Sequence, residues 1–158
     1  MKIELWFIGK TSFSYLKEGL AIYENRLKRY GSFNSVLIPD VKHAKNMNAH
    51  VLKIKEGEAV LNRLKPNDTL IVLDENGKAF TSVELAKFIE EKQNYSTKTL
   101  VFLIGGAFGF SEAVYQRAQH KLSLSKMTFS HQMIRLFVVE QLYRAFTIIN
   151  SEPYHNEG

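Results

Sequence analysis

The stretch TLIVLDENGKAFTSVELAKFIEEKQNYSTKTLVFLI, residues 69–104, determines the fold class of this 158-residue chain. It begins with one continuous apolar run, residues 69–73, and ends with another, residues 99–104. Such runs are typical of strands that are buried on both faces of a parallel sheet. Between them, Thr81 and Glu84 form a capping-box pattern that predicts a helix to about residue 94. The segment therefore predicts a strand–helix–strand unit of an α/β fold.

The same alternation of apolar runs and helical periodicity extends in both directions from this unit. Further strands are expected at residues 3–8, 35–38 and 122–124. Helices are expected at residues 13–30, along a stripe of Leu16, Leu20, Tyr23 and Leu27; at 47–64, carrying Val51, Ile54 and Leu61; after Ser111; and from residue 131. Residues 74–78 (DENGK) are expected to form a turn. The predicted fold is a mostly parallel sheet of five to six strands with helices on both faces, in a single domain of residues 1–158.

Composition excludes several classes of site. The chain has no cysteine, which excludes disulfides, thiolate nucleophiles and cysteine–zinc sites. Its five histidines show no ligand spacing such as H-E-x-x-H, so no metal is expected. No apolar run reaches the roughly 18 residues of a membrane span, and Glu4 interrupts the first one too early for a signal peptide. A cytoplasmic protein without membrane contact is expected.

The net charge of +5 is concentrated in the first half of the chain. Residues 1–79 hold 13 Lys and Arg against 9 Asp and Glu, which leaves +4 for that half. Lys42, His43, Lys45, Lys53 and Lys55 follow one another closely and could face the phosphates of a nucleic acid. Lysines are also ordinary residues of helix surfaces, so charge alone leaves both interpretations open.

Three segments follow the carboxyl ends of predicted strands, where open α/β sheets bind ligands. They are the residues after Leu73, the loop GGAFG at 105–109, and residues 124–129. The glycines of the loop allow a ligand to approach the backbone closely, although an ordinary turn also requires glycine. Ala107 breaks a G-x-G-x-x-G pattern, and the loop follows the fourth strand rather than the first. A dinucleotide-binding fold is therefore disfavoured.

The last helix and tail, HQMIRLFVVEQLYRAFTIINSEPYH at 131–155, combine an apolar surface on nearly every side with embedded charges. Complete cover for such a helix is most easily supplied by a second subunit, and its charges then need partners or a ligand. Glu140 and Arg144 have the favoured i, i+4 order of an ion pair, and His131 and Arg135 form a second i, i+4 couple. Residues 153–155 (PYH) lie in a tail that frays unless it is held, so a purely structural tail also stays open.

Taken together, four segments resemble the SPOUT methyltransferases, and more narrowly the bacterial enzymes that methylate N3 of a pseudouridine in 23S rRNA. They are LIGGAFGF (103–110), LSLSKMTFSHQMIR (122–135), EQLYRAF (140–146) and PYH (153–155). The resemblance covers essentially the whole chain. It departs from the family pattern at Ser130, where many relatives have proline.

The resemblance implies a homodimer with a C-terminal trefoil knot that binds S-adenosylmethionine as methyl donor and needs no metal. The implied substrate is 23S rRNA in assembled ribosomes, which agrees with the basic first half of the chain. By position, the residues implied to contact the donor are Leu73, Gly105, Leu124, Ser125, Lys126, Met127, Thr128 and Phe129.

Catalytic roles are expected for three residues of the last helix and tail. An imide nitrogen is mostly protonated at neutral pH, so methyl transfer requires loss of its proton and stabilisation of the resulting negative charge. We expect Arg144 to bind the uracil carbonyl or phosphate, His155 to act as base or proton relay, and Tyr154 to stack on or hydrogen-bond the nucleoside. Two alternatives remain at this point: a SPOUT methyltransferase acting on tRNA, and a non-catalytic ribosome-binding factor.

Overall fold

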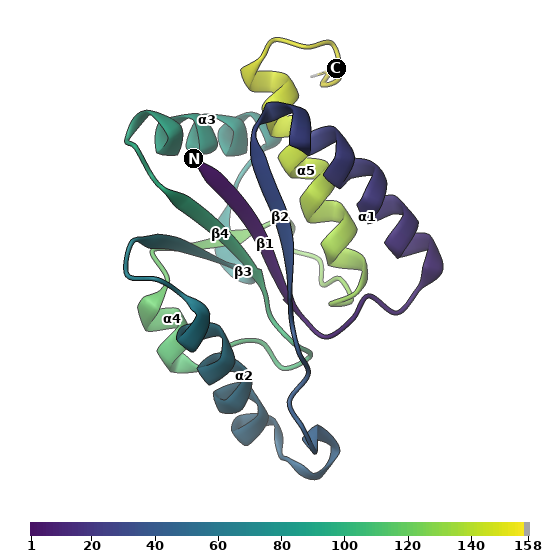
Figure 1. Ribbon diagram of the computed structural model, residues 1–158, viewed down its shortest axis with the longest axis vertical. Helices are drawn as coiled ribbons and strands as arrows, with labels where there is room; N and C mark the ends of the chain where they lie inside the picture. The colour runs from purple at the N-terminus through teal and green to yellow at the C-terminus, as the bar shows by residue number, and fades with distance from the viewer. Residues whose placement is uncertain (157–158) are drawn as a thin grey trace.

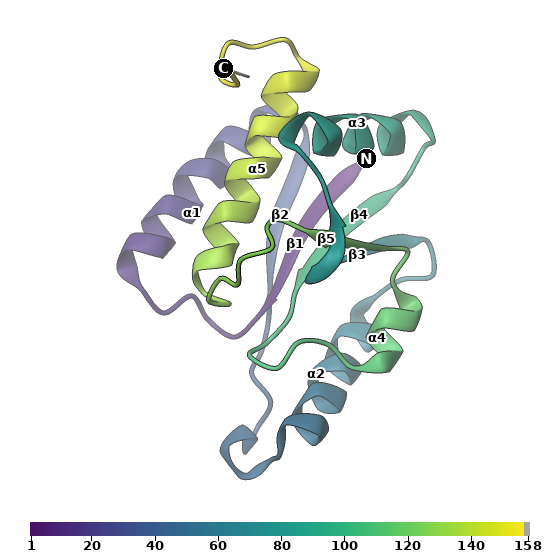
Figure 2. The same cartoon turned by 180° about the vertical axis from the view of Figure 1, so that it is seen from behind.

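The computed structural model, which describes residues 1–156, has a five-stranded sheet between two layers of helices (Figures 1 and 2). The strand order is β2-β1-β4-β3-β5, and every pairing is parallel. The strands are β1 (Lys2–Ile8), β2 (Ser32–Ile38), β3 (Asp68–Ala79), β4 (Thr99–Ile104) and β5 (His120–Ser123). All carboxyl ends therefore meet at one edge of the sheet. The predicted α/β class and parallel sheet are confirmed, with five strands.

The helices divide between the two faces of the sheet. They are α1 (Ser14–Leu27), α2 (Ala49–Arg63), α3 (Ser82–Asn94), α4 (Glu112–Arg117) and α5 (Met133–Ile149), with short 3₁₀ turns η1 (Lys28–Tyr30) and η2 (Ala44–Asn46). One hydrophobic cluster joins α1, α3 and α5 to the sheet, and a second joins α2 and α4 to the opposite face (Figure 1). The single-domain expectation extended to residue 158, and residues 157–158 lie outside the described residues.

Helices α3 and α4 each begin at a residue whose side chain caps the helix N-terminus. The Thr81 side chain accepts a hydrogen bond from the backbone N–H of Glu84, whose carboxylate accepts one from the N–H of Thr81. This is the predicted capping box, and it starts α3. The Ser111 hydroxyl accepts a hydrogen bond from the N–H of Val114 and starts α4, as expected. The predicted caps are thus confirmed.

The turn predicted at residues 74–78 was wrong. Instead β3 continues to Ala79, with a register shift after Leu73, because Leu73 and Lys78 both pair with Leu122 of β5. The polar residues between them bulge out of the ladder, and the chain then resumes its direction rather than reversing. Gly77 permits this approach, since a Cβ there would lie 2.7 Å from the backbone of Lys121.

The buried face of α2 is not formed by the first two apolar residues named for this helix, Val51 and Ile54. Val51 and Ile54 are 37% and 40% exposed, whereas Glu56, Gly57 and Val60 are buried. The cause is the close packing of α2 on α4, because a Cβ on Gly57 would lie 2.5 Å from the Ser111 hydroxyl. Because α2 approaches α4 closely at Gly57, the side of α2 that carries Glu56 faces the interior.

Arg135, one of the charges embedded in α5, finds its partners within its own chain. The residue is only 1% exposed, and its guanidinium donates hydrogen bonds to the backbone carbonyls of Ile8 (2.8 Å) and Gly9 (3.0 Å) and to the Thr11 hydroxyl (3.1 Å). Its Nε donates to the backbone carbonyl of His131, so the expected His131–Arg135 couple forms through the main chain. The buried charge therefore ties the start of α5 to the end of β1.

Cover of α5 is incomplete in one chain. Met133 and Phe137 are 37% and 42% exposed on its outer surface. Within residues 1–156, no helix has the length and apolar character required to cross a membrane.

Candidate active site

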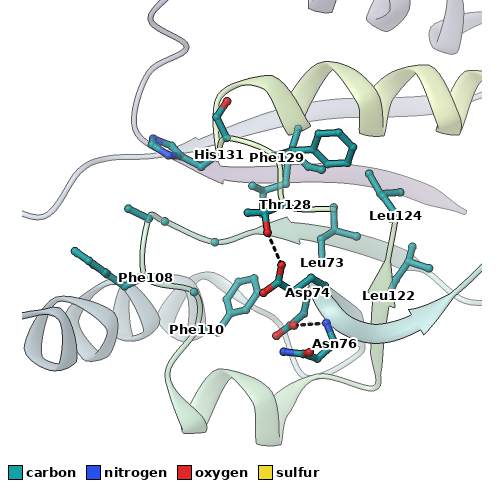
Figure 3. A pocket seen from close by; sticks show the side chains of 18 of the residues that line it. Leu73, Asp74, Asn76, Phe108, Phe110, Leu122, Leu124, Thr128, Phe129 and His131 are labelled. Atoms are coloured by element: carbon teal, nitrogen blue, oxygen red, sulfur yellow. Dashed lines mark hydrogen bonds between the residues drawn. The ribbon is translucent and has the colours of Figure 1, made fainter. Parts of the chain in front are cut away.

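A cavity of about 570 Å³ lies at the carboxyl ends of β3, β4 and β5 (Figure 3). The strand register creates it, because Leu73 at the end of the regular part of β3 pairs with Ile104 on one side and Leu122 on the other. All three residues line the cavity. Its volume is in the range of sites for drug-sized ligands.

The glycine loop forms one wall of this cavity. Gly105, Gly106 and Gly109 all line it, and the N–H of Gly109 donates to the carbonyl of Gly106 at 3.2 Å to close the turn. Gly109 has a φ of 82°, which favours glycine. Phe110 is buried beneath the loop, with its ring 3.0 Å from where a Cβ on Gly105 would lie. A ligand would therefore meet backbone groups along this wall.

The loop between β5 and α5 forms the facing wall. Of the eight residues implied to contact the donor, seven line the cavity: Leu73, Gly105, Leu124, Ser125, Met127, Thr128 and Phe129. Lys126 belongs to the same loop but is not part of the lining. The Ser125 side chain shapes the loop, since its Oγ accepts a hydrogen bond from the N–H of Met127 at 3.0 Å.

Ser130, the departure from the family pattern, has a local role in the structure. Its hydroxyl accepts a hydrogen bond from the N–H of Met133 at 3.0 Å, which satisfies a backbone donor at the start of α5. Proline has no side-chain oxygen for this bond. Ser130 and His131 both line the cavity, so the departure lies at the site itself.

The sequence indicated the residues after Leu73 as a candidate ligand-binding segment, but the turn expected there meant that the carboxylates of Asp74 and Glu75 were not singled out. Glu75 accepts a hydrogen bond from the Thr128 hydroxyl at 2.8 Å, which joins the bulge of β3 to the facing loop. Asp74 accepts hydrogen bonds from the Tyr115 hydroxyl and from the N–H of Asn76. Burial and the neighbouring Asp74 raise the pKa of Tyr115, which keeps the phenol protonated. Asp74 and Glu75 come directly after a buried strand, and this position was the sequence signal that could have identified them as site residues.

The three expected catalytic residues lie together with Glu140. Arg144 forms an ion pair of 2.6 Å with Glu140, its Nη1 lies 3.3 Å from Nδ1 of His155, and its guanidinium lies 4.7 Å from the Tyr154 ring centroid. The Tyr154 hydroxyl donates to Glu140 at 3.0 Å. The hydrogen bond to Glu140 raises the pKa of Arg144, and burial, followed by hydrogen bonds with Tyr23 and Glu140, raises that of Tyr154. We call Glu140, Arg144, Tyr154 and His155 the tail cluster.

The tail is held against the body of the chain. Glu152 accepts a hydrogen bond from Arg29 at 2.6 Å and another from the Tyr30 hydroxyl at 2.8 Å. The Tyr154 ring meets Tyr143 edge to face, with 4.8 Å between ring centroids. These contacts place Tyr154 and His155 beside α5, where an unsupported tail would fray.

The tail cluster and the cavity are well separated within one chain. Ile134, in the first turn of α5, lines the cavity, whereas Arg144 lies ten residues further along the helix. At about 1.5 Å of rise per residue, this corresponds to about 15 Å. The tail accordingly leaves α5 at the end opposite to the loop that bounds the cavity (Figure 1). Two parts of a site are therefore present, but a single chain does not bring them together.

The parallel α/β fold and the cavity at its carboxyl edge are those of a ligand-binding α/β protein, and comparison with known proteins identifies the family. A family model described as "Predicted SPOUT methyltransferase" matches residues 1–155, and the chain belongs to this family. Its members transfer the methyl group of S-adenosylmethionine, and the family implies the C-terminal trefoil knot that general rules of chain connection disfavour.

Named proteins of similar sequence align with nearly the full length of this chain. The protein called ribosomal RNA large subunit methyltransferase H in Parabacteroides distasonis is 54% identical over 157 residues, covering 99% of this chain and 100% of the relative. The protein of the same name in Cytophaga hutchinsonii is 53% identical over 156 residues, with the same coverage.

A solved structure shows the same fold at low identity. The probable methyltransferase from Bordetella pertussis Tohama I has a TM-score of 0.55 at 12% identity, over 91% of this chain and 95% of the other. In residues 1–156, no three His, Cys, Asp or Glu side chains gather in a way that could hold a metal ion.

Proposed function

We propose that this protein methylates N3 of a pseudouridine in the 23S rRNA of the large ribosomal subunit, with S-adenosylmethionine as methyl donor. The observation that carries the proposal is the convergence of seven expected donor contacts on one cavity at the carboxyl edge of the sheet. Relatives named as methyltransferases of large-subunit ribosomal RNA, about half identical over their full length, support the choice of substrate.

The cavity has the chemistry required to hold this donor. Backbone groups of Gly105 and Gly106 can contact the ligand, while Leu73, Leu124 and Phe129 supply apolar surface that excludes water. The two carboxylates at the cavity, Asp74 and Glu75, place negative charge where a cationic ligand would bind, while the phenol of Tyr115 stays protonated and neutral. When bound, S-adenosylmethionine supplies an electrophilic methyl group on a sulfonium centre. Much of the acceleration comes from holding this group in line with the acceptor nitrogen in a dry site.

The tail cluster has the chemistry required by the acceptor. The guanidinium of Arg144 is positively charged, and its hydrogen bond to Glu140 raises its pKa further. Arg144 can therefore stabilise the negative charge of a deprotonated uracil ring. His155 can take the N3 proton directly or through a relay. Tyr154 stays protonated because its pKa is raised, and it therefore acts through its ring or as a hydrogen-bond donor.

We further propose that the protein is a homodimer in which the tail cluster of one subunit faces the cavity of the other. The separation of about 15 Å along α5 supports this arrangement, because one chain holds the two parts apart. Apolar side chains near the cavity are also exposed in a single chain, among them Met127 (76%), Phe108 (55%) and Phe137 (42%). A second copy would cover them. Light scattering at micromolar concentration should give twice the monomer mass of 18.2 kDa.

The remaining partner is the ribosome. The exposed side chains of Lys42 and Lys45 on the segment between β2 and α2, with the exposed His43 between them, fit contact with rRNA phosphates. We also propose that the protein acts in the cytoplasm, where ribosomes assemble, and that residues 1–158 form a single domain.

A labelled-donor assay tests the proposal. Ribosomes that lack the modification, free large subunits and tRNA are each incubated with the protein and radiolabelled S-adenosylmethionine. We expect label in 23S rRNA from ribosomes and none in tRNA. Label in tRNA would identify the other SPOUT activity, and ribosome binding without donor binding in isothermal titration would identify a non-catalytic factor. Either result would refute the proposal.

A further inference from the structure

Glu56 of α2 is a buried carboxyl group that the proposed reaction does not use. It is 7% exposed, and among the described residues its Oε2 has no hydrogen-bond partner. Each of the other buried polar side chains has one, namely Thr11, Asp68, Ser111, Ser123, Arg135 and Thr147. An unpaired buried carboxyl destabilises a fold, so stability does not explain its presence.

This carboxyl group lies directly against the glycine loop. A Cβ on Gly106 would be 2.3 Å from Oε2 and 2.9 Å from Oε1 of Glu56. The φ of Gly106 lies outside the left-handed region, so its backbone conformation would also suit alanine. The carboxyl of Glu56 is therefore the group that a side chain at position 106 would meet and displace.

The same contact connects α2 to the cavity. Gly106 lines the cavity, while Glu56 touches this residue without lining the cavity itself. One residue along α2, Gly57 packs against Ser111, which starts the helix that follows the loop. Helix α2 thus contacts the glycine loop at Gly106 and the start of the next helix at Ser111.

We propose that Glu56 is a positioning residue that holds the backbone of the glycine loop in the conformation that binds the methyl donor. Its unpaired oxygen forms a hydrogen bond with the loop backbone in the donor-bound state, which offsets the cost of its burial. Burial, and secondarily the nearby Asp40, raises the pKa of Glu56, consistent with a carboxyl group that lacks a partner before the donor binds. The inference rests on the proposed donor site. It adds a residue of α2, outside the cavity lining, that holds one wall of this site in place.

Paired measurements of donor binding and thermal unfolding test the proposal. Glu56→Met keeps the length of the side chain and removes its polar atoms. We expect donor affinity to fall by about tenfold or more, while the unfolding temperature without donor is unchanged or higher, because an unsatisfied buried group has been removed. Glu56→Gln keeps hydrogen-bonding capacity and should stay within about threefold of wild type. Glu58→Met, on the exposed side of the same helix, is the matched control.

Two results would overturn the inference. Wild-type donor affinity in Glu56→Met would show that the residue does not position the loop. A lower unfolding temperature of this variant without donor would assign it a structural role instead. Failure of the wild-type protein to bind donor in the same titrations would refute the proposed function, so the two failures are distinguishable.

A double-mutant cycle tests whether Glu56 acts through Gly106. Gly106→Ala brings a methyl group against the carboxyl and should weaken donor binding. Glu56→Ala should also weaken it, while making room for that methyl group. We expect the double variant to bind donor no more weakly than the weaker single variant, because both changes disturb one contact. If the two losses multiply, the residues act independently and the proposed route is wrong.

Discussion

Arg144 and Glu140 lie one helical turn apart on α5 and form an ion pair of 2.6 Å that orients the whole tail cluster. The pair is partly buried, with 25% and 19% of the two side chains exposed. Nη2 of Arg144 is directed to Glu140, Nη1 lies beside His155, and the guanidinium lies over Tyr154. One carboxylate thus fixes a cation, and the cation is placed beside both residues of the tail that we expect to meet the nucleoside.

Arg144→Ala should lower the rate of methyl transfer far more than donor affinity. Loss of a positioned donor that stabilises developing charge costs about 10²–10³ in rate, whereas the cavity lies at the other end of α5. Single-turnover kinetics and donor titration measure the two quantities. Arg63→Ala removes an arginine of α2, far from the tail cluster in sequence, that lies over the ring of Trp6 in β1, and it serves as control. Equal losses of rate and donor affinity would mean that Arg144 maintains the pocket.

Deletion of residues 153–158 should abolish methyl transfer and leave dimerisation and donor binding nearly intact. The deleted segment contains Tyr154 and His155, whereas the cavity lining ends at Ile134 of α5. Sedimentation, donor titration and the transfer assay on one preparation give the three quantities. Full activity of the truncated protein would show that the tail is not catalytic.

Arg135→Ala should reduce the free energy of unfolding by about 3–5 kcal/mol, because it leaves several buried acceptors without a partner. The acceptors are the carbonyls of Ile8 and Gly9 and the Thr11 hydroxyl. Urea denaturation measures the change. Lys17→Ala, on the exposed side of α1, should stay within about 0.5 kcal/mol of wild type. A similar small change for Arg135→Ala would mean that its hydrogen bonds contribute little net stability.

The stability difference between the wild type and Glu56→Gln should depend on pH. Burial raises the pKa of Glu56 above its ordinary value of 4.5, and Asp40 is the charged group that adds to this shift. A raised carboxyl pKa means that the folded state binds the proton more tightly, so the associated stability is present below pH 4.5 and is lost as the pH rises through the folded-state pKa. Relative to the non-titrating glutamine, the wild type should lose unfolding temperature over this interval. A difference that is constant with pH would contradict the shift.

Thr128→Val should weaken donor binding by about three- to tenfold, the effect of roughly one hydrogen bond. The Thr128 hydroxyl joins the loop before α5 to Glu75 at 2.8 Å, and both residues line the cavity. Valine keeps the shape of threonine and removes the donor. Isothermal titration measures the effect. An unchanged affinity would show that this bond does not hold the two walls together.

Local patterns were sufficient for most of the fold. The buried runs at β3 and β4 and the capping box of α3 depend on neighbouring residues, and the structure has them where they were predicted. The bulge after Leu73 could not be predicted in this way, since it depends on pairing with β5 some fifty residues later. The same holds for the exposure of Val51 and Ile54, which follows from the contact between Gly57 and Ser111.

The site was predictable in part for the same reason. The glycine loop and the residues after β5 are contiguous segments at strand ends, so sequence and resemblance could identify them. Asp74 and Glu75 were hidden by a turn-like composition, and Glu56 by its place inside a helix. The role of Glu56 depends on which residue of another element lies against it, and only the packed structure reveals that contact.

Mixing two inactive variants tests most directly whether the cavity of one subunit works with the tail of its partner. Gly105→Val places a side chain against Phe110 at the donor site, and Arg144→Ala disables the tail cluster. Unfolding and refolding the two together gives heterodimers, each with one site that has an intact cavity and an intact partner tail. Random pairing then predicts recovery of about a quarter of the wild-type rate of methyl transfer. Activity no greater than that of the separate variants, with heterodimers shown to be present, would contradict the account.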